Sequence, residues 1–159
     1  HGDYHLGQVL IHEEDVYIVD FEGEPTRPLE ERRRLQSPMK DVAGMVRSFC
    51  YAAGTGLAAR QLIFPGEGDR AAAWADWWQT WSIASFLQSY RATADGARFL
   101  PDDPNALDGL LRLYLFEKAI YEARYEAAHR PAWMGIPLRG LLALMDGVDL
   151  TGPEKSSEK

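Results

Sequence analysis

Apolar residues recur every three or four positions over most of this chain, which is the spacing of helices that bury one face. Three long stretches and one shorter stretch show it, and polar segments containing glycine or proline separate them. The predicted helices cover residues 38–53, 70–91, 107–128 and 138–145, with loops at 22–37, 54–68 and 93–104. The pattern therefore predicts a mainly α-helical domain.

A different pattern precedes the first predicted helix. Two short runs rich in β-branched residues, Gln8–Ile11 and Val16–Asp20, lie on either side of the polar segment His12-Glu13-Glu14-Asp15. Runs of this length around a polar turn are typical of an antiparallel hairpin. We expect a short β-hairpin that returns its far end to the neighbourhood of the first residues of the chain.

Two of the predicted helices are unusually apolar. The second carries Trp74, Trp77, Trp78 and Trp81 at helical spacing, and we expect these rings to form an aromatic stripe in the core. Stacking of a sugar on one of them is the alternative. The third helix is rich in leucine around nearly its whole circumference in its first half, which predicts a central, buried position.

Composition narrows the class of protein. The chain has 159 residues, 46% of them hydrophobic, and a net charge of −7, which fits one globular domain and argues against a nucleic-acid or anionic-membrane surface. No apolar run approaches the length of a membrane span, so a cytoplasmic location is the default expectation. Cys50 is the only cysteine, and we expect its thiol to be buried. Residues 1–150 are expected to form the domain, and the polar residues 151–159 a disordered tail.

The first twenty residues carry the clearest chemistry. Asp3 is followed five positions later by Gln8, and Asp20 closes the second strand of the predicted hairpin. A carboxylate beside an acceptor hydroxyl, together with two oxygen ligands for magnesium, is the layout of a kinase catalytic loop and metal loop. The alternatives are a capping role for Asp3 and a zinc site that uses His1-Gly2-Asp3-Tyr4-His5.

Several motifs together resemble the C-terminal lobe of maltokinases, sugar kinases of the aminoglycoside-phosphotransferase-like group that are often fused to trehalose synthase. The motifs are His1 to Gln8, Asp20 to Pro25, Asp41 to Phe49, Glu117 to Glu122, Arg130 to Trp133 and Ile136 to Leu138. The resemblance implies a kinase-like C-lobe without its nucleotide-binding N-lobe. We therefore expect the isolated chain to bind ATP weakly and to turn over negligibly.

The resemblance also implies a reaction, the ATP- and Mg²⁺-dependent phosphorylation of maltose at its anomeric hydroxyl, which feeds α-glucan biosynthesis. By this resemblance Asp3 is the catalytic base, Gln8 and Asp20 hold magnesium, and His1 and Asp41 support the catalytic loop. The expected sugar-binding residues are His5, Glu117, Lys118, Tyr121, Tyr125 and Trp133.

Two alternatives to maltose phosphorylation stay open at this point. One is a kinase for another sugar or for an aminoglycoside-like acceptor, because no spacing argument separates maltose from similar compounds. The other is an inactive kinase-like fragment that keeps the fold and assembles beside a trehalose synthase domain. Maltose, ATP, an N-lobe and trehalose synthase are thus the expected partners.

Overall fold

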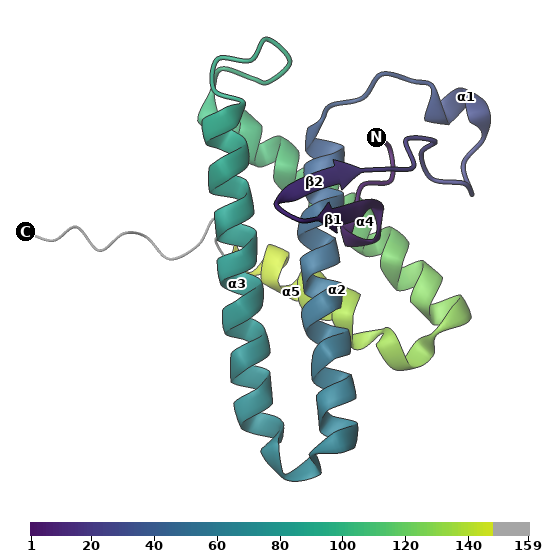
Figure 1. Ribbon diagram of the computed structural model, residues 1–159. Coiled ribbons are helices and arrows are strands. Elements are labelled where there is room, and N and C mark those ends of the chain that lie inside the picture. The colour runs from purple at the N-terminus through teal and green to yellow at the C-terminus, as the bar shows by residue number, and fades with distance from the viewer. Residues whose placement is uncertain (148–159) are drawn as a thin grey trace, which may run out of the picture.

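The fold is organised around two long antiparallel helices. In the computed structural model, which describes residues 1–147, α2 (Met39–Ile63) and α3 (Gly68–Thr93) lie side by side and are joined by the short helix η2 (Pro65–Glu67) (Figure 1). The predicted tail at 151–159 lies outside the described residues. A mainly helical architecture is thus confirmed.

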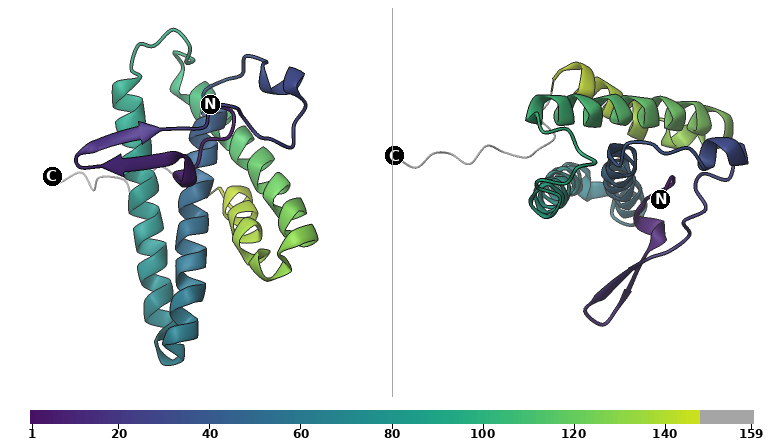
Figure 2. Two further views of the ribbon diagram at one scale, coloured as in Figure 1. Left: turned by 45° about the vertical axis from the view of Figure 1, so that its right-hand side comes forward. Right: turned by 90° about the horizontal axis from the view of Figure 1, so that it is seen from above.

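The remaining elements cover the two faces of this helix pair. Helices α4 (Pro104–His129) and α5 (Gly135–Met145) lie on one side, and the hairpin lies on the other (Figure 2). Strands β1 (Val9–His12) and β2 (Asp15–Ile18) pair in antiparallel fashion, which confirms the predicted hairpin. Short helices complete the chain, namely η1 (Leu6–Gln8), α1 (Leu29–Arg32) and η3 (Pro131–Trp133).

The apolar core lies where α2, α3 and α4 meet and includes one residue of α5. Its buried side chains are Met39, Val42, Ala43, Val46, Ile83, Leu87, Leu111, Leu115 and Leu144. The central position belongs to α2, which packs against α3, α4 and α5, and not to α4 as predicted. Helix α4 buries only one of its faces, since Leu113 in its first half is 62% exposed.

The first helix is longer than predicted. The glycines at 54 and 56 led us to expect a loop, whereas α2 continues through them to Ile63. A Cβ at Gly54 would lie 2.8 Å from Cγ1 of Ile136, so this glycine allows α5 to pack closely on α2. The following residues, Leu57 to Leu62, are mostly strong helix formers, which outweighs the local cost of the glycines.

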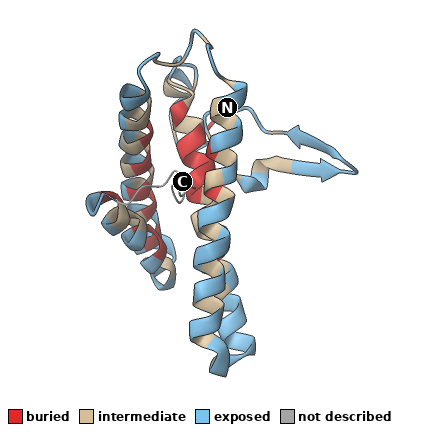
Figure 3. Cartoon of the chain, turned by 90° about the vertical axis from the view of Figure 1, so that its left-hand side faces the viewer, coloured by how far each residue is buried: buried red, intermediate tan, exposed pale blue. Residues whose placement is uncertain are grey.

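The predicted tryptophan core stripe is wrong. Trp74, Trp77, Trp78 and Trp81 are between 37% and 59% exposed. The buried residues of α3 are Ile83 and Leu87, in its C-terminal half. The N-terminal half of α3 and the end of α2 project beyond the other elements as a largely exposed pair (Figure 3). The helical spacing therefore showed correctly that the four tryptophans share one face of α3, but it did not show whether that face is buried.

A buried ionic network joins α2 to α4. Arg47 places Nε 2.8 Å and Nη2 2.7 Å from Oε2 of Glu122. One turn further along α4, Glu126 accepts hydrogen bonds from the hydroxyl of Tyr51 at 2.9 Å and from Nε and Nη2 of Arg130 at 2.9 and 2.7 Å. Burial raises the pKa of the Glu122 carboxyl, and the Arg47 guanidinium opposes this effect.

Burial also raises the pKa of the Cys50 thiol, which lowers its thiolate fraction, although the residue is half-buried and not fully buried as predicted. Among the helices of residues 1–147, none is long and apolar enough to cross a lipid bilayer.

Candidate active site

The first residues of the chain lie against the N-terminal half of α2. The carboxylate of Asp41 accepts hydrogen bonds from the backbone nitrogens of His1 and Gly2, each at 2.8 Å. At Gly44 a Cβ would lie 2.6 Å from the carbonyl oxygen of Tyr4, so the loop can reach α2 only because this residue has no side chain. The contacts of Asp41 are those expected from the sequence, while its part in catalysis stays a prediction.

The ring of His1 connects this loop to the segment after β2. Its Nε2 lies 2.9 Å from the carbonyl oxygen of Val19, and since a carbonyl can only accept, Nε2 carries the hydrogen. Its Nδ1 then accepts the backbone N–H of Asp3 at 3.4 Å. The ring also packs against Phe21 with 4.8 Å between centroids. His1 thereby ties Asp3 to the segment that carries Asp20.

The hairpin brings Gln8 and Asp20 together. Nε2 of Gln8 donates to Oδ2 of Asp20 at 2.8 Å, and the two residues are twelve positions apart. Asp20 has a φ of 65°, the left-handed conformation that aspartate tolerates better than most residues. Over residues 1–147, no three His, Cys, Asp or Glu side chains converge on a possible metal site. Two oxygen ligands fit a magnesium ion only if phosphates or water complete its coordination.

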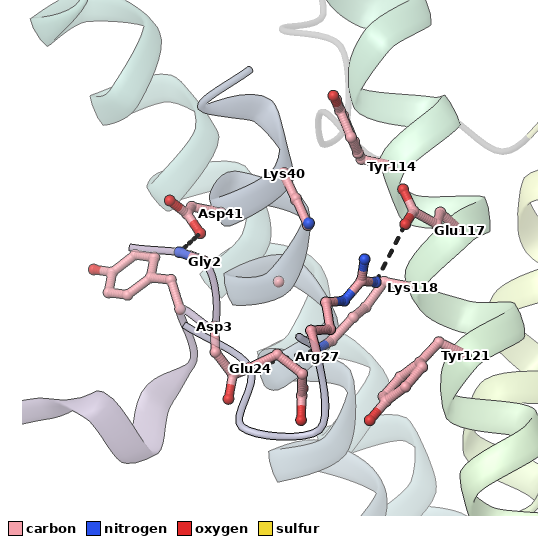
Figure 4. A pocket seen from close by; sticks show the side chains of 12 residues that line it. Gly2, Asp3, Glu24, Arg27, Lys40, Asp41, Tyr114, Glu117, Lys118 and Tyr121 are labelled. Atoms are coloured by element: carbon pink, nitrogen blue, oxygen red, sulfur yellow. Dashed lines mark hydrogen bonds and ion pairs between the residues drawn. The ribbon is translucent and has the colours of Figure 1, made fainter. Parts of the chain in front are cut away.

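Asp3 lines a small hollow between the loop, α2 and α4 (Figure 4). Its side chain is 17% exposed. Nζ of Lys118 lies 3.5 Å from Oδ1 of Asp3, and Nε2 of His5 lies 3.9 Å from Oδ2. The carboxylate is therefore accessible to a ligand in the hollow and has one cationic neighbour from α4.

The opposite wall of the hollow is one face of α4. Tyr114, Glu117, Lys118 and Tyr121 line it at helical spacing. Arg27, from the loop before α1, reaches across and places Nη2 3.5 Å from Oε1 of Glu117 (Figure 4).

The floor of the hollow includes Lys40 of α2, whose ammonium donates to the side-chain oxygen of Gln36 at 2.8 Å. Burial, followed by the charge of Arg27, lowers the pKa of Lys40. The loop before α1, helix α2 and helix α4 thus all contribute charged side chains to the hollow.

Three of the expected sugar-binding residues lie elsewhere. His5 is not among the residues that line this hollow, and its Nδ1 accepts the backbone N–H of Gly7 at 3.0 Å. Tyr125 and Trp133 are not among them either. The guanidinium of Arg130 lies over both rings, 5.1 Å from the centroid of Tyr125 and 4.3 Å from that of Trp133. Tyr125 lies one turn beyond Tyr121 on α4 and stacks on its ring with 6.5 Å between centroids, whereas Trp133 belongs to η3.

Seven residues that line the hollow were not among the predicted site residues, namely Gly2, Tyr4, Glu24, Arg27, Lys40, Gly44 and Tyr114. Tyr114 was detectable, since it precedes Glu117 by three positions and Lys118 by four on a predicted helix. Arg27 was not, because its contact with Glu117 joins residues 90 positions apart.

A helical lobe with an accessible loop aspartate, and with a carboxylate and a carboxamide on a neighbouring hairpin, is the arrangement found in enzymes that transfer phosphoryl groups. The comparisons with known proteins point to one branch of these enzymes. No protein-family model matches the chain. A glucosamine kinase of Streptacidiphilus jiangxiensis is 32% identical over 146 residues, covering 91% of this chain and 31% of that protein.

A glucosamine kinase of Mycolicibacterium smegmatis is also 32% identical, over 92% of this chain and 34% of its own length. The chain thus spans about a third of the curated relatives it matches.

Solved structures give the same result. Crystal form B of a glucosamine kinase superposes with a TM-score of 0.71 at 28% identity, over 92% of this chain and 33% of that one. A glucosamine kinase in complex with glucosamine, ADP and inorganic phosphate superposes with a TM-score of 0.65 at 30% identity, over 94% and 32%. The chain is therefore similar to part of a sugar kinase, and these likenesses do not support maltose or a trehalose synthase partner in particular.

Proposed function

We propose that this chain is the catalytic lobe of an ATP-dependent sugar kinase that phosphorylates maltose at its anomeric hydroxyl. The observation that carries the proposal is the position of Asp3. Its carboxylate opens into the hollow, while the ring of His1 links its backbone to the carbonyl of Val19, next to Asp20. An acceptor in the hollow would thus lie beside a base that is tied to the candidate metal ligands.

Each side chain has a defined task in this reaction. The carboxylate of Asp3 accepts a hydrogen bond from the acceptor hydroxyl and takes its proton as the phosphoryl group transfers. Lys118 holds a positive charge 3.5 Å from Oδ1 of Asp3. Gln8 and Asp20 would hold Mg²⁺, which when bound offsets the negative charge of the nucleotide phosphates. The Asp41 carboxylate keeps the loop seated on α2.

Glucosamine is the second candidate acceptor, because the relatives named above are glucosamine kinases. One residue favours it. Glu24 lines the hollow, and its Oε1 accepts a hydrogen bond from the hydroxyl of Thr26 at 3.1 Å, so it presents a carboxylate that could meet an ammonium group. Maltose is supported by the maltokinase-like motifs around Glu24 and along α4.

Replacement of the proposed base tests the reaction itself. In the full-length protein that contains this chain, Asp3→Asn should lower kcat for sugar-dependent ATP consumption about 10²–10⁴-fold, because the amide cannot accept the proton. Steady-state assays with maltose and with glucosamine measure the loss, and circular dichroism checks the fold. Asp69→Asn, an exposed aspartate in the first turn of α3, is the matched control and should retain activity. Activity of Asp3→Asn within a few-fold of the parent would disprove the assignment.

A further inference from the structure

We propose that Arg27 determines the acceptor class by neutralising Glu117, so that the hollow favours a neutral sugar over a cationic amino sugar. The inference rests on the proposed sugar kinase function and adds to it a specificity-determining residue. It starts from a contact between a loop and a helix that no sequence motif indicates. Arg27 and Glu117 are 90 positions apart, yet their side chains meet over the cavity that Asp3 lines (Figure 4).

The geometry places the guanidinium loosely between two carboxylates. Arg27 lies 3.5 Å from Glu117 on α4 and 3.8 Å from Glu31 on α1, and its side chain is 32% exposed. Both separations are longer than those of a tight charge-assisted hydrogen bond, which is about 2.7–2.9 Å. The positive charge is thus oriented toward the hollow by its partners and is still accessible to a ligand.

Two of the carboxylates that line the hollow are paired with cations, while Glu24 and Lys40 add one carboxylate and one cation without an ion-pair partner among residues 1–147. Lys118 faces Asp3 and Arg27 faces Glu117, while Asp41 is occupied by backbone nitrogens. Lys40 adds a third cation to the lining. A neutral sugar can donate its hydroxyls to these carboxylates without breaking the pairs. An ammonium group that approaches Glu117 or Asp3 must compete with the cation already paired with that carboxylate, and the repulsion between like charges disfavours it there.

Loss of Arg27 should reverse this balance. Without it, Glu117 loses its cationic partner on the wall of the hollow, and Glu24 presents a second carboxylate among the same lining residues. Two carboxylates in a partly enclosed site attract an ammonium group. The wild-type protein should therefore prefer maltose, and the Arg27 variant should move toward glucosamine.

The experiment compares both sugars in the full-length protein and in three variants. The kcat/KM ratio of glucosamine to maltose should rise about tenfold or more in Arg27→Met, mainly through KM. Arg27→Lys, which keeps the charge, should stay near the wild-type ratio. The double variant Arg27→Met with Glu117→Gln should lose the gain, because it removes the carboxylate that the arginine neutralised.

Equilibrium binding of both sugars, by calorimetry, separates this inference from the proposed function. A wild type that prefers glucosamine, or an unchanged ratio in Arg27→Met, overturns the role of Arg27 while sugar-dependent ATP consumption still supports a kinase. A shifted binding ratio without phosphoryl transfer to either sugar overturns the kinase proposal and supports the charge selection. Absence of binding to both sugars in the wild type overturns both.

Discussion

Two glutamates of α4 show how one helix serves both the core and the cavity. Glu117 and Glu122 are five positions apart, which places them about 140° apart around the helix axis. Glu122 has a side chain 9% exposed and lies 2.7 Å from Nη2 of Arg47. Glu117 is 49% exposed and lies 3.5 Å from Arg27. The same kind of ion pair, an arginine with a glutamate, is thus buried on one face of the helix and exposed on the other.

The exposed pair and the buried pair differ in how much their loss changes the free energy of unfolding. An exposed, long ion pair contributes about 0–1 kcal/mol because water screens it. A buried pair offers little net stability over apolar residues, yet removal of one partner leaves an uncompensated charge and costs about 3–5 kcal/mol. Charges that face the cavity can therefore change with little effect on the fold, whereas those beneath α4 cannot.

The largest expected effect is from Arg47→Met. This change should lower the free energy of unfolding by about 3–5 kcal/mol, because Glu122 stays buried without its partner. Chemical denaturation of the full-length protein measures the loss. The double variant Arg47→Met with Glu122→Leu should recover most of it. A single variant as stable as the wild type would contradict a structural role for the pair.

The pH dependence of the stability of Arg47→Met tests whether the unpaired charge of Glu122 causes the loss. Burial already raises the pKa of Glu122 above its usual 4.5, and loss of the opposing arginine raises it further. A raised folded-state pKa means that the contribution to stability is complete below about pH 4.5 and is lost as pH rises through the folded value. The deficit of Arg47→Met should thus be larger at pH 8 than at pH 5, and an equal deficit would argue against Glu122 as its source.

A smaller effect is expected at Gly140, whose missing side chain makes room for this pair. A Cβ at this position would overlap Nη1 of Arg47, so Gly140→Ala should cost about 1–3 kcal/mol through overpacking. Gly109→Ala is the matched control, since a Cβ at that helical glycine has open space around it. The control should be neutral or slightly stabilising in thermal unfolding. Equal results for the two variants would refute the packing argument.

The smallest expected effect on stability is from Glu117→Gln. The exposed pair with Arg27 predicts a change in the free energy of unfolding below about 1 kcal/mol. The isosteric change Glu122→Gln on the opposite face should cost clearly more. Denaturant midpoints of the two variants check this contrast directly, and a large loss from Glu117→Gln would place that residue among the supports of the fold.

Local signals predicted the elements well. The hairpin followed from its β-branched runs. Helix α4 begins three residues before its predicted start at 107, because Asp103 caps it by accepting the N–H of Asn105 and Pro104 takes the first position. The convergence of Gln8 and Asp20 was also predicted, since a hairpin alone brings them together.

Tertiary contacts explain what the sequence could not show. The reason for a glycine inside α2 at position 54 is the close approach of Ile136, which lies far along the chain. The exposure of Trp77 depends on where α4 and α5 end, and the pairing of Arg27 with Glu117 depends on the path of a loop. Periodicity reports which residues share a face but carries no information on what covers that face.

The close approach at Gly44 has a consequence for how this chain can evolve. Every other amino acid adds a Cβ, which would meet the Tyr4 carbonyl oxygen at 2.6 Å, and that oxygen belongs to backbone that cannot rotate away as a side chain would. No substitution at this position is therefore mild, because even alanine lifts the loop that carries Asp3. The shape of the candidate active site is therefore constrained by a position on α2 that carries no functional group.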